Sequence, residues 1–170
     1  MPQTRTHQPP ASASTVLAEI LATAARNLKY NVKRKGEFAE SFFQLRALAL
    51  GFLVSKLWGD SAPADFHVEW PGRLSRIQVK SAWSPARADS YWINTVIRSG
   101  RKGCRAYSPA EIDFYACIVM PLGLVYIIPS RAVKPGQKCL FLYPIRPRRH
   151  QSGPRMPSYE KFRERWDLLQ

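Results

Sequence analysis

Four polar residues have the types and spacing that could support hydrolysis of a phosphodiester bond: Glu40, Asp65, Gln78 and Lys80. Carboxylate and amide oxygens are ligands that Mg²⁺ prefers, and few are needed because the ion keeps several waters. A bound metal lowers the pKa of a water and offsets charge on the reacting phosphoryl group, and a lysine ammonium can orient that water or stabilise the charge. These residues form a candidate metal-dependent site, with Mg²⁺ as the expected ion and Mn²⁺ as a substitute.

A β-hairpin is expected to bring three of these residues together. Alternating apolar residues predict strands over 65–70 and 74–80, and the Pro-Gly pair between them is typical of a turn. Alternate residues of a strand point to the same face, so Gln78 and Lys80 share one face. Asp65 opens the first strand, and the hairpin would place it near both.

Glu40 belongs to the clearest predicted helix, over residues 36–50. It shares a helical face with Phe43 and Ala47, so its carboxylate is expected near the core rather than free in solvent. Glu37 lies one turn earlier and is the alternative helix carboxylate. An acid at that position also suits a helix N-terminus for structural reasons alone.

The remaining elements predict a mixed α/β or α+β fold. Residues 1–14 carry too little apolar surface to fold and are expected to be disordered. Residues 31–35 are expected to be a basic connector. The other predicted elements are a helix over 15–28, strands over 52–57, 91–97, 113–120 and 124–128, and an amphipathic helix over 159–169.

The chain is strongly basic, with a formal net charge of +14 from 26 Lys and Arg against 12 Asp and Glu. Such an excess attracts polyanions, of which nucleic acid is the commonest inside cells. A solvated basic surface without a partner is the alternative. The predicted nucleic-acid-binding residues lie in two loops, and they are Arg98, Arg101, Lys102, Arg105, Arg146, Arg148 and Arg149.

Several features argue for a cytoplasmic protein without membrane contact. No apolar run approaches the roughly 20 residues of a spanning helix, and the N-terminal segment lacks the pattern of a secretory signal. The three cysteines are odd in number and show no CxxC spacing, so neither a disulfide framework nor a zinc site is expected.

Six short stretches within residues 33–169 together resemble a known family: KGEFAE at 35–40, PAD at 63–65, IQVKS at 77–81, AEIDFY at 110–115, YIIP at 126–129 and FRERW at 162–166. They look like the PD-(D/E)xK nuclease superfamily, in the branch of group I intron homing endonucleases that uses Gln-x-Lys. The resemblance implies a restriction-endonuclease-like core with a four-stranded mixed central β-sheet flanked by helices. It gives Glu40, Asp65, Gln78 and Lys80 the catalytic roles. The expected metal ligands are Glu40, Asp65, Gln78 and the backbone carbonyl of Val79.

These observations predict a flexible N-terminal extension with a short helix over residues 1–30 and a PD-(D/E)xK-like nuclease domain over 31–170. The expected function is Mg²⁺-dependent DNA endonuclease. One alternative is a structure-specific nuclease for junctions or repair on the same core, and another is a catalytically inactive nucleic-acid-binding module. Cutting both strands of a duplex needs two sites, which predicts a homodimer or a larger homo-oligomer.

Overall fold

The computed structural model describes residues 13–59, 62–86, 90–98, 103–145 and 158–170. A five-stranded sheet forms its centre, in the order β1-β2-β3-β7-β8. The β3–β7 pair is parallel and the other pairs are antiparallel, so the sheet is mixed, as expected. It has one strand more than the four that the resemblance implied, because β1 adds to the edge at β2. The strands are β1 (Leu53–Lys56), β2 (Phe66–Trp70), β3 (Arg73–Ala82), β7 (Phe114–Val119) and β8 (Leu124–Pro129).

The predicted hairpin is present as β2 and β3. Its register runs from Phe66 opposite Ile77 to Trp70 opposite Arg73. Gly72 has a φ of 80° in the two-residue turn, a conformation that glycine adopts without strain. Strand β3 continues past the start of β2, so its second half pairs on one side only, with β7.

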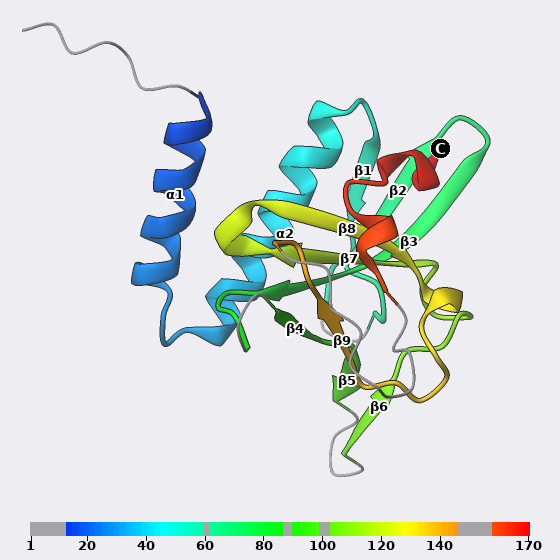
Figure 1. Cartoon of the computed structure of the whole chain (residues 1–170). Coiled ribbons are helices and arrows are strands. Elements are labelled where there is room, and N and C mark those ends of the chain that lie inside the picture. The colour runs from blue at the N-terminus through cyan, green and yellow to red at the C-terminus, as the bar shows by residue number, and fades with distance from the viewer. Residues whose placement is uncertain (1–12, 60–61, 87–89, 99–102, 146–157) are drawn as a thin grey trace, which may run out of the picture.

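Helix α2 (Val32–Ala49) covers one face of the sheet (Figure 1). It begins four residues earlier than predicted, so the expected connector over 31–35 is wrong. Asn31 is the N-cap, and its side chain accepts a hydrogen bond from the backbone N–H of Arg34 at 3.0 Å. Gly51, with a φ of 86°, follows the end of the helix.

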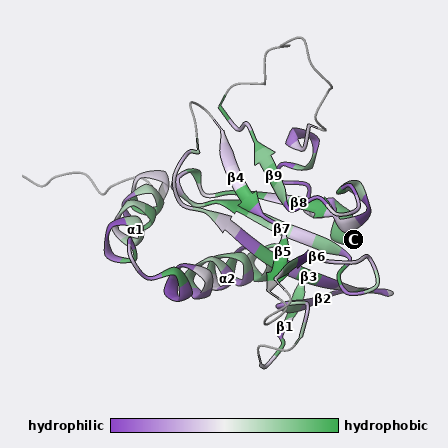
Figure 2. Cartoon of the chain, turned by 90° about the horizontal axis from the view of Figure 1, so that it is seen from below, coloured by the Kyte–Doolittle hydropathy of each residue, from purple (hydrophilic) through white to green (hydrophobic). Residues whose placement is uncertain are grey.

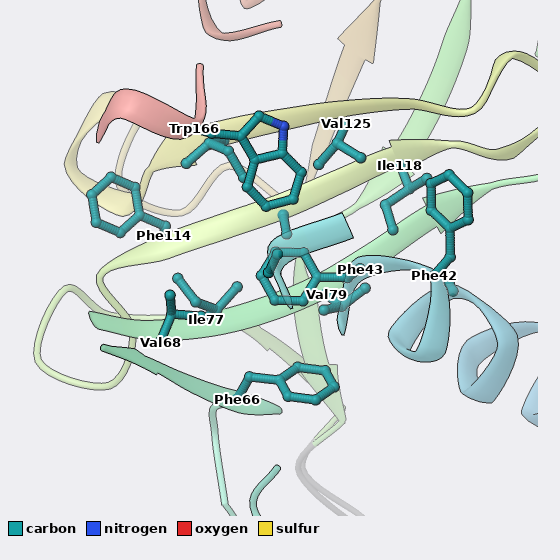
Figure 3. Packing of buried hydrophobic residues seen from close by; sticks show 14 of the residues in the cluster. Phe42, Phe43, Phe66, Val68, Ile77, Val79, Phe114, Ile118, Val125 and Trp166 are labelled. Carbon is teal, nitrogen blue, oxygen red and sulfur yellow. The ribbon is translucent and has the colours of Figure 1, made fainter. Parts of the chain in front are cut away.

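The core beneath α2 is rich in aromatic rings (Figure 3). Phe43 is fully buried and packs between Phe66 and Trp166, with ring centroids 5.5 and 5.6 Å away. Ile77 and Val79 of β3 point into the same core. Gln78 and Lys80 alternate with them, and so belong to the opposite face of the sheet.

Two short strand pairs lie apart from the main sheet. Strand β4 (Tyr91–Asn94) pairs with β9 (Cys139–Leu142), and β5 (Val96–Arg98) pairs with β6 (Cys104–Ala106). The β4–β9 pair packs on the face of the sheet opposite α2. The strand predicted over 91–97 is therefore two strands. The break falls at Thr95, whose N–H and hydroxyl donate to the carbonyls of Lys138 and Gln137.

Helix α1 (Ala13–Asn27) lies beside α2, on the side away from β1 and β2 (Figure 1). Leu21 is buried in the main core, so this part of the expected extension packs against the domain. Figure 2 shows that both helices carry hydrophilic and hydrophobic residues side by side. Disorder was expected over residues 1–14; residues 1–12 lie outside the described residues, and the prediction is wrong for residues 13 and 14, which form the start of α1. Within the described ranges, no helix is both long and apolar enough to cross a membrane.

The predicted helix over 159–169 is wrong. Two 3-10 turns take its place, η4 (Glu160–Phe162) and η5 (Trp166–Leu169), with extended backbone at Arg163 and a φ of 53° at Glu164. This stretch attaches to the edge of β8 through a bridge between Tyr126 and Arg163. The Glu164 carboxylate accepts hydrogen bonds from the Val125 N–H, the Arg46 guanidinium and the Trp166 indole, each at 2.8 Å. Two further 3-10 turns flank β8, at Met120–Leu122 and Ser130–Ala132.

Candidate active site

The backbone of Asp65 is fixed where three strands meet. Its N–H donates to the carbonyl of Ile77 at 2.8 Å, and its own carbonyl accepts from the N–H of Leu57 at 2.9 Å. The residue thus continues the hairpin one step beyond β2 and lies against the end of β1. As predicted, the hairpin brings its side chain to the second half of β3.

The Asp65 carboxylate is bound to β3 by its Oδ2 atom. The N–H of Val79 donates to that atom at 2.7 Å, and the side-chain amide of Gln78 donates to it as well. Burial raises the pKa of Asp65 to about 6, against the hydrogen bond from Val79, and the nearby charge of Glu40 raises it further. The Asp65 carboxyl group therefore releases its proton less readily than an exposed aspartate does.

Several oxygen atoms gather around this carboxylate. The N–H of Val79 points to the side on which β2 has ended, and the carbonyl of the same residue lies 3.3 Å from the Gln78 side-chain nitrogen. Neither group of Val79 is therefore used in pairing with β2. Gln78 is buried, with 5% of its surface exposed. The amide in this structure bridges two oxygens, one from Asp65 and one from Val79.

Helix α2 places Glu40, and not Glu37, near Asp65. The Glu40 carboxylate is 23% exposed and pairs with Lys56 of β1 at 3.0 Å. Its charge acts on both Asp65 and Lys80. Glu37 is exposed on the helix. Of the two acids, Glu40 is thus the one that lies beside Asp65, and Lys56 is a neighbour that the sequence pattern did not predict.

Lys80 reaches the same region from β3. Its ammonium donates to the hydroxyl of Tyr107 at 3.2 Å and lies 5.1 Å from the centre of that ring. Burial lowers the pKa of Lys80, while the negative charges of Asp65 and Glu40 oppose the change. The sequence did not predict Tyr107 as a neighbour of the site. Its contact with Lys80 spans 27 residues, which no local pattern could indicate.

Most of the predicted nucleic-acid-binding residues fall outside the described structure. Arg101, Lys102, Arg146, Arg148 and Arg149 do so entirely, and for Arg98 only the backbone, at the end of β5, is described. Arg105 is described, and its guanidinium forms a two-pronged ion pair with Glu111, at 2.6 and 2.8 Å. Its charge is therefore partly offset within the chain.

The donor set fits a hard cation with few protein ligands. Among the described residues there is no group of three or more His, Cys, Asp and Glu side chains that could hold a metal. Glu40 and Asp65 supply two carboxylates and Val79 a carbonyl oxygen, while the Gln78 amide presents its nitrogen to them in this structure. Mg²⁺ is commonly held by one or two carboxylates and retains several waters. These oxygens suit Mg²⁺ better than zinc, which takes nitrogen and sulfur.

A mixed sheet with a helix on one face, and a half-buried Asp facing a Gln-x-Lys strand, places the protein among nucleases with a restriction-endonuclease-like fold. The sequence model of the PD-(D/E)XK endonuclease family matches residues 30–164, and the chain belongs to that family. The structure is similar to that of a bacterial homing endonuclease, I-Ssp6803I, with a TM-score of 0.67 and 27% identity over 82% of this chain and 93% of that chain. No curated protein matches the sequence. The family expected from the sequence is confirmed.

Proposed function

We propose that this chain is a Mg²⁺-dependent endonuclease that hydrolyses DNA phosphodiester bonds. The observation that carries the proposal is the half-buried Asp65 carboxylate bound against the Gln-x-Lys segment of β3, with Glu40 and Lys80 acting on it electrostatically. A pKa near 6 in a group of this kind is common at functional sites. The family and the homing endonuclease with a similar structure favour the same activity.

Each residue has a role that follows from its position. Glu40, Asp65 and the carbonyl of Val79 would hold the ion, and Gln78 would turn its amide oxygen toward it in place of the nitrogen. When bound, Mg²⁺ would activate a water and offset charge on the phosphoryl oxygens. Lys80 would orient that water or stabilise charge at the reacting phosphate, since its ammonium lies on the same face of β3 as Gln78.

DNA is the proposed substrate because the chain carries a net charge of +14 and a polyanion offsets it. We also propose that the protein is cytoplasmic, where it would have access to DNA. The basic loops that hold Arg98, Arg101, Lys102, Arg146, Arg148 and Arg149 are proposed to contact its phosphates. Arg105 would contribute less, because Glu111 already binds it. We extend the proposal to a homodimer or larger homo-oligomer, to be checked by light scattering, because one site cuts one strand.

Nicking of supercoiled plasmid in Mg²⁺, with EDTA as the control, tests the proposed function. We expect Asp65→Ala and Lys80→Ala to lower the rate about 10²-fold or more while the protein stays folded, since such losses follow removal of a group that stabilises the transition state. Glu40→Ala should do the same. Glu37→Ala is the matched control, one turn away on α2 and exposed, and should cut normally.

Near-normal cutting by folded Asp65→Ala would overturn the assignment of the site. Salt-sensitive binding without cutting, in Mg²⁺ or Mn²⁺ and on linear or four-way-junction DNA, would point to a binding module. Cutting of the junction alone would point to a structure-specific nuclease.

A further inference from the structure

We propose that Tyr107 is a positioning residue that holds the ammonium of Lys80 in place for phosphodiester hydrolysis. This inference rests on the proposed function, because the position of Lys80 matters only if that residue acts in the reaction. The direct observation is the hydrogen bond from Lys80 Nζ to the Tyr107 hydroxyl at 3.2 Å, with the ammonium 5.1 Å from the ring centre.

Lys80 needs a partner because its side chain is a flexible four-carbon stem with a point charge at its end. Two carboxylates act on it, those of Asp65 and Glu40, and an ion pair with either would remove an oxygen from the candidate metal site. Among the described residues, Lys80 forms no ion pair with a carboxylate, whereas Lys56 pairs with Glu40. Tyr107 thus offers Lys80 a neutral acceptor, so that Lys80 itself does not occupy an oxygen of either carboxylate.

Tyr107 is itself held by packing. Its ring meets the buried ring of Tyr115 on β7 edge to face, with centroids 5.8 Å apart and planes at 83°. Such aromatic pairs add about 0.5–1.5 kcal/mol beyond the area they bury. Burial also raises the pKa of the Tyr107 phenol, so the hydroxyl stays neutral and can accept a hydrogen bond from an ammonium.

One carboxylate, that of Glu111, binds residues on both sides of Tyr107. Glu111 accepts hydrogen bonds from the N–H and the hydroxyl of Ser108, at 2.9 and 3.0 Å, and it binds Arg105 as well. The hydrogen bond from Arg105 lowers the pKa of Glu111 to about 2, so this acid stays ionised at neutral pH. The residues before and after Tyr107 in this segment are therefore anchored to the same carboxylate.

Tyr107→Phe is the test, because it removes one oxygen and keeps the ring against Tyr115. Tyr159→Phe is the matched control, since the Tyr159 hydroxyl also makes one 3.2 Å hydrogen bond, to Gln137 in another part of the fold. In single-turnover cleavage we expect Tyr107→Phe to slow the reaction about 10-fold or more, as loss of a hydrogen bond to a charged group would. The Kd for DNA in Ca²⁺ should change less than 2-fold, and Tyr159→Phe should cut as wild type does.

A second readout does not depend on activity. The side-chain ammonium of Lys80, assigned by its loss in Lys80→Arg, should give a ¹⁵N–¹H signal in metal-free protein that shifts or broadens in Tyr107→Phe and stays unchanged in Tyr159→Phe. Unchanged cleavage by Tyr107→Phe overturns the inference whatever the signal does, and so does an unchanged signal. If wild type itself cuts no DNA, the proposed function fails, and an altered Lys80 signal in Tyr107→Phe then shows that the contact exists without serving this reaction.

Discussion

At the scale of single residues, the site is built at a cost in stability. Asp65 is a half-buried carboxylate whose negative charge is opposed by burial and by Glu40 but favoured by the hydrogen bond from Val79 and by Lys80 and Lys56. Burial of an ionised group without full compensation lowers the stability of the folded chain. A bound cation would reverse this, because it binds only the ionised form in the folded state.

The pH dependence of stability follows from the sign of this shift. The pKa of Asp65 rises from 3.8 to about 6 on folding, so between pH ~4 and ~6 the folded chain keeps a proton that the unfolded chain has released. The contribution of Asp65 to the unfolding free energy therefore falls as pH rises through this window, by about 2–3 kcal/mol at about 1.4 kcal/mol per pKa unit.

We expect Asp65→Asn to be more stable than wild type at pH 7 in EDTA, and about equally stable near pH 4, in urea unfolding curves. Comparison with the variant separates the effect of Asp65 from the effects of Glu111 and Asp113. The pKa values of those two acids are lowered, so their contributions to the unfolding free energy are lost only at lower pH and are the same in both proteins. An equal difference between the two proteins at both pH values would contradict the raised pKa.

The sequence predicted the residues of the site better than their surroundings. Asp65, Gln78 and Lys80 could be placed because a tight hairpin and strand alternation are local features, and Glu40 because helical periodicity put it near the core. Lys56 and Tyr107 were missed as neighbours of the site. Their contacts depend on how β1 and the segment after β6 lie against β3, and this is set by long-range packing.

At the scale of elements, the C-terminal segment shows where local patterns fail. Phe162, Trp166 and Leu169 are spaced as on one face of a helix, and this spacing predicted one. The structure has two 3-10 turns, with Glu164 at a positive φ between them. The bridge to β8 and the three hydrogen bonds to Glu164 favour the broken form, and none of them is visible in a window of neighbouring residues.

For helix α2 the error was the opposite one, because the predicted helix was too short. The run of basic residues from 31 to 35 was interpreted as a connector, yet Asn31 caps the helix and Val32 begins it. Lysine and arginine are good helix formers, so their charge was no reason to end the helix there.

Removal of the Glu164 carboxylate should destabilise the chain. In Glu164→Ala the N–H of Val125 would lose its acceptor, and Arg46 and the Trp166 indole would lose theirs. We expect the unfolding free energy to fall by roughly 2–3 kcal/mol, typical of leaving polar groups of the interior without partners. Urea unfolding measures it, with Asp167→Ala as the control in the same segment.

Asp167 forms an exposed ion pair with Arg165, so its removal should matter far less. Equal losses in Glu164→Ala and Asp167→Ala would show that Glu164 does not anchor the segment.

At the scale of the whole molecule, the charge should govern the affinity for DNA. Binding that replaces condensed counterions gives a slope of about −0.9 per phosphate contact in a plot of log K against log salt. With a net charge of +14, we expect about five to eight phosphate contacts and hence a slope of about −4.5 to −7 for duplex DNA. Fluorescence anisotropy in Ca²⁺ at several KCl concentrations measures it. A slope near zero would show that binding involves few contacts with DNA phosphates, and it would contradict this part of the proposal.

The sheet joins β3 to β7 in parallel, with Ile77 opposite Phe114, so the chain between them must travel the length of the sheet before the two strands can pair. Contacts between strands this far apart in sequence form late in folding, because the entropy of closing the intervening loop is lost before the pairing compensates for it. Tyr107 lies in that intervening stretch and Lys80 lies on β3. While β7 is still inside the ribosome, the part of the chain that has emerged already contains Asp65, Gln78 and Lys80. It still lacks β7, the strand that pairs with β3. We therefore expect the candidate site to form only after β7 has left the ribosome.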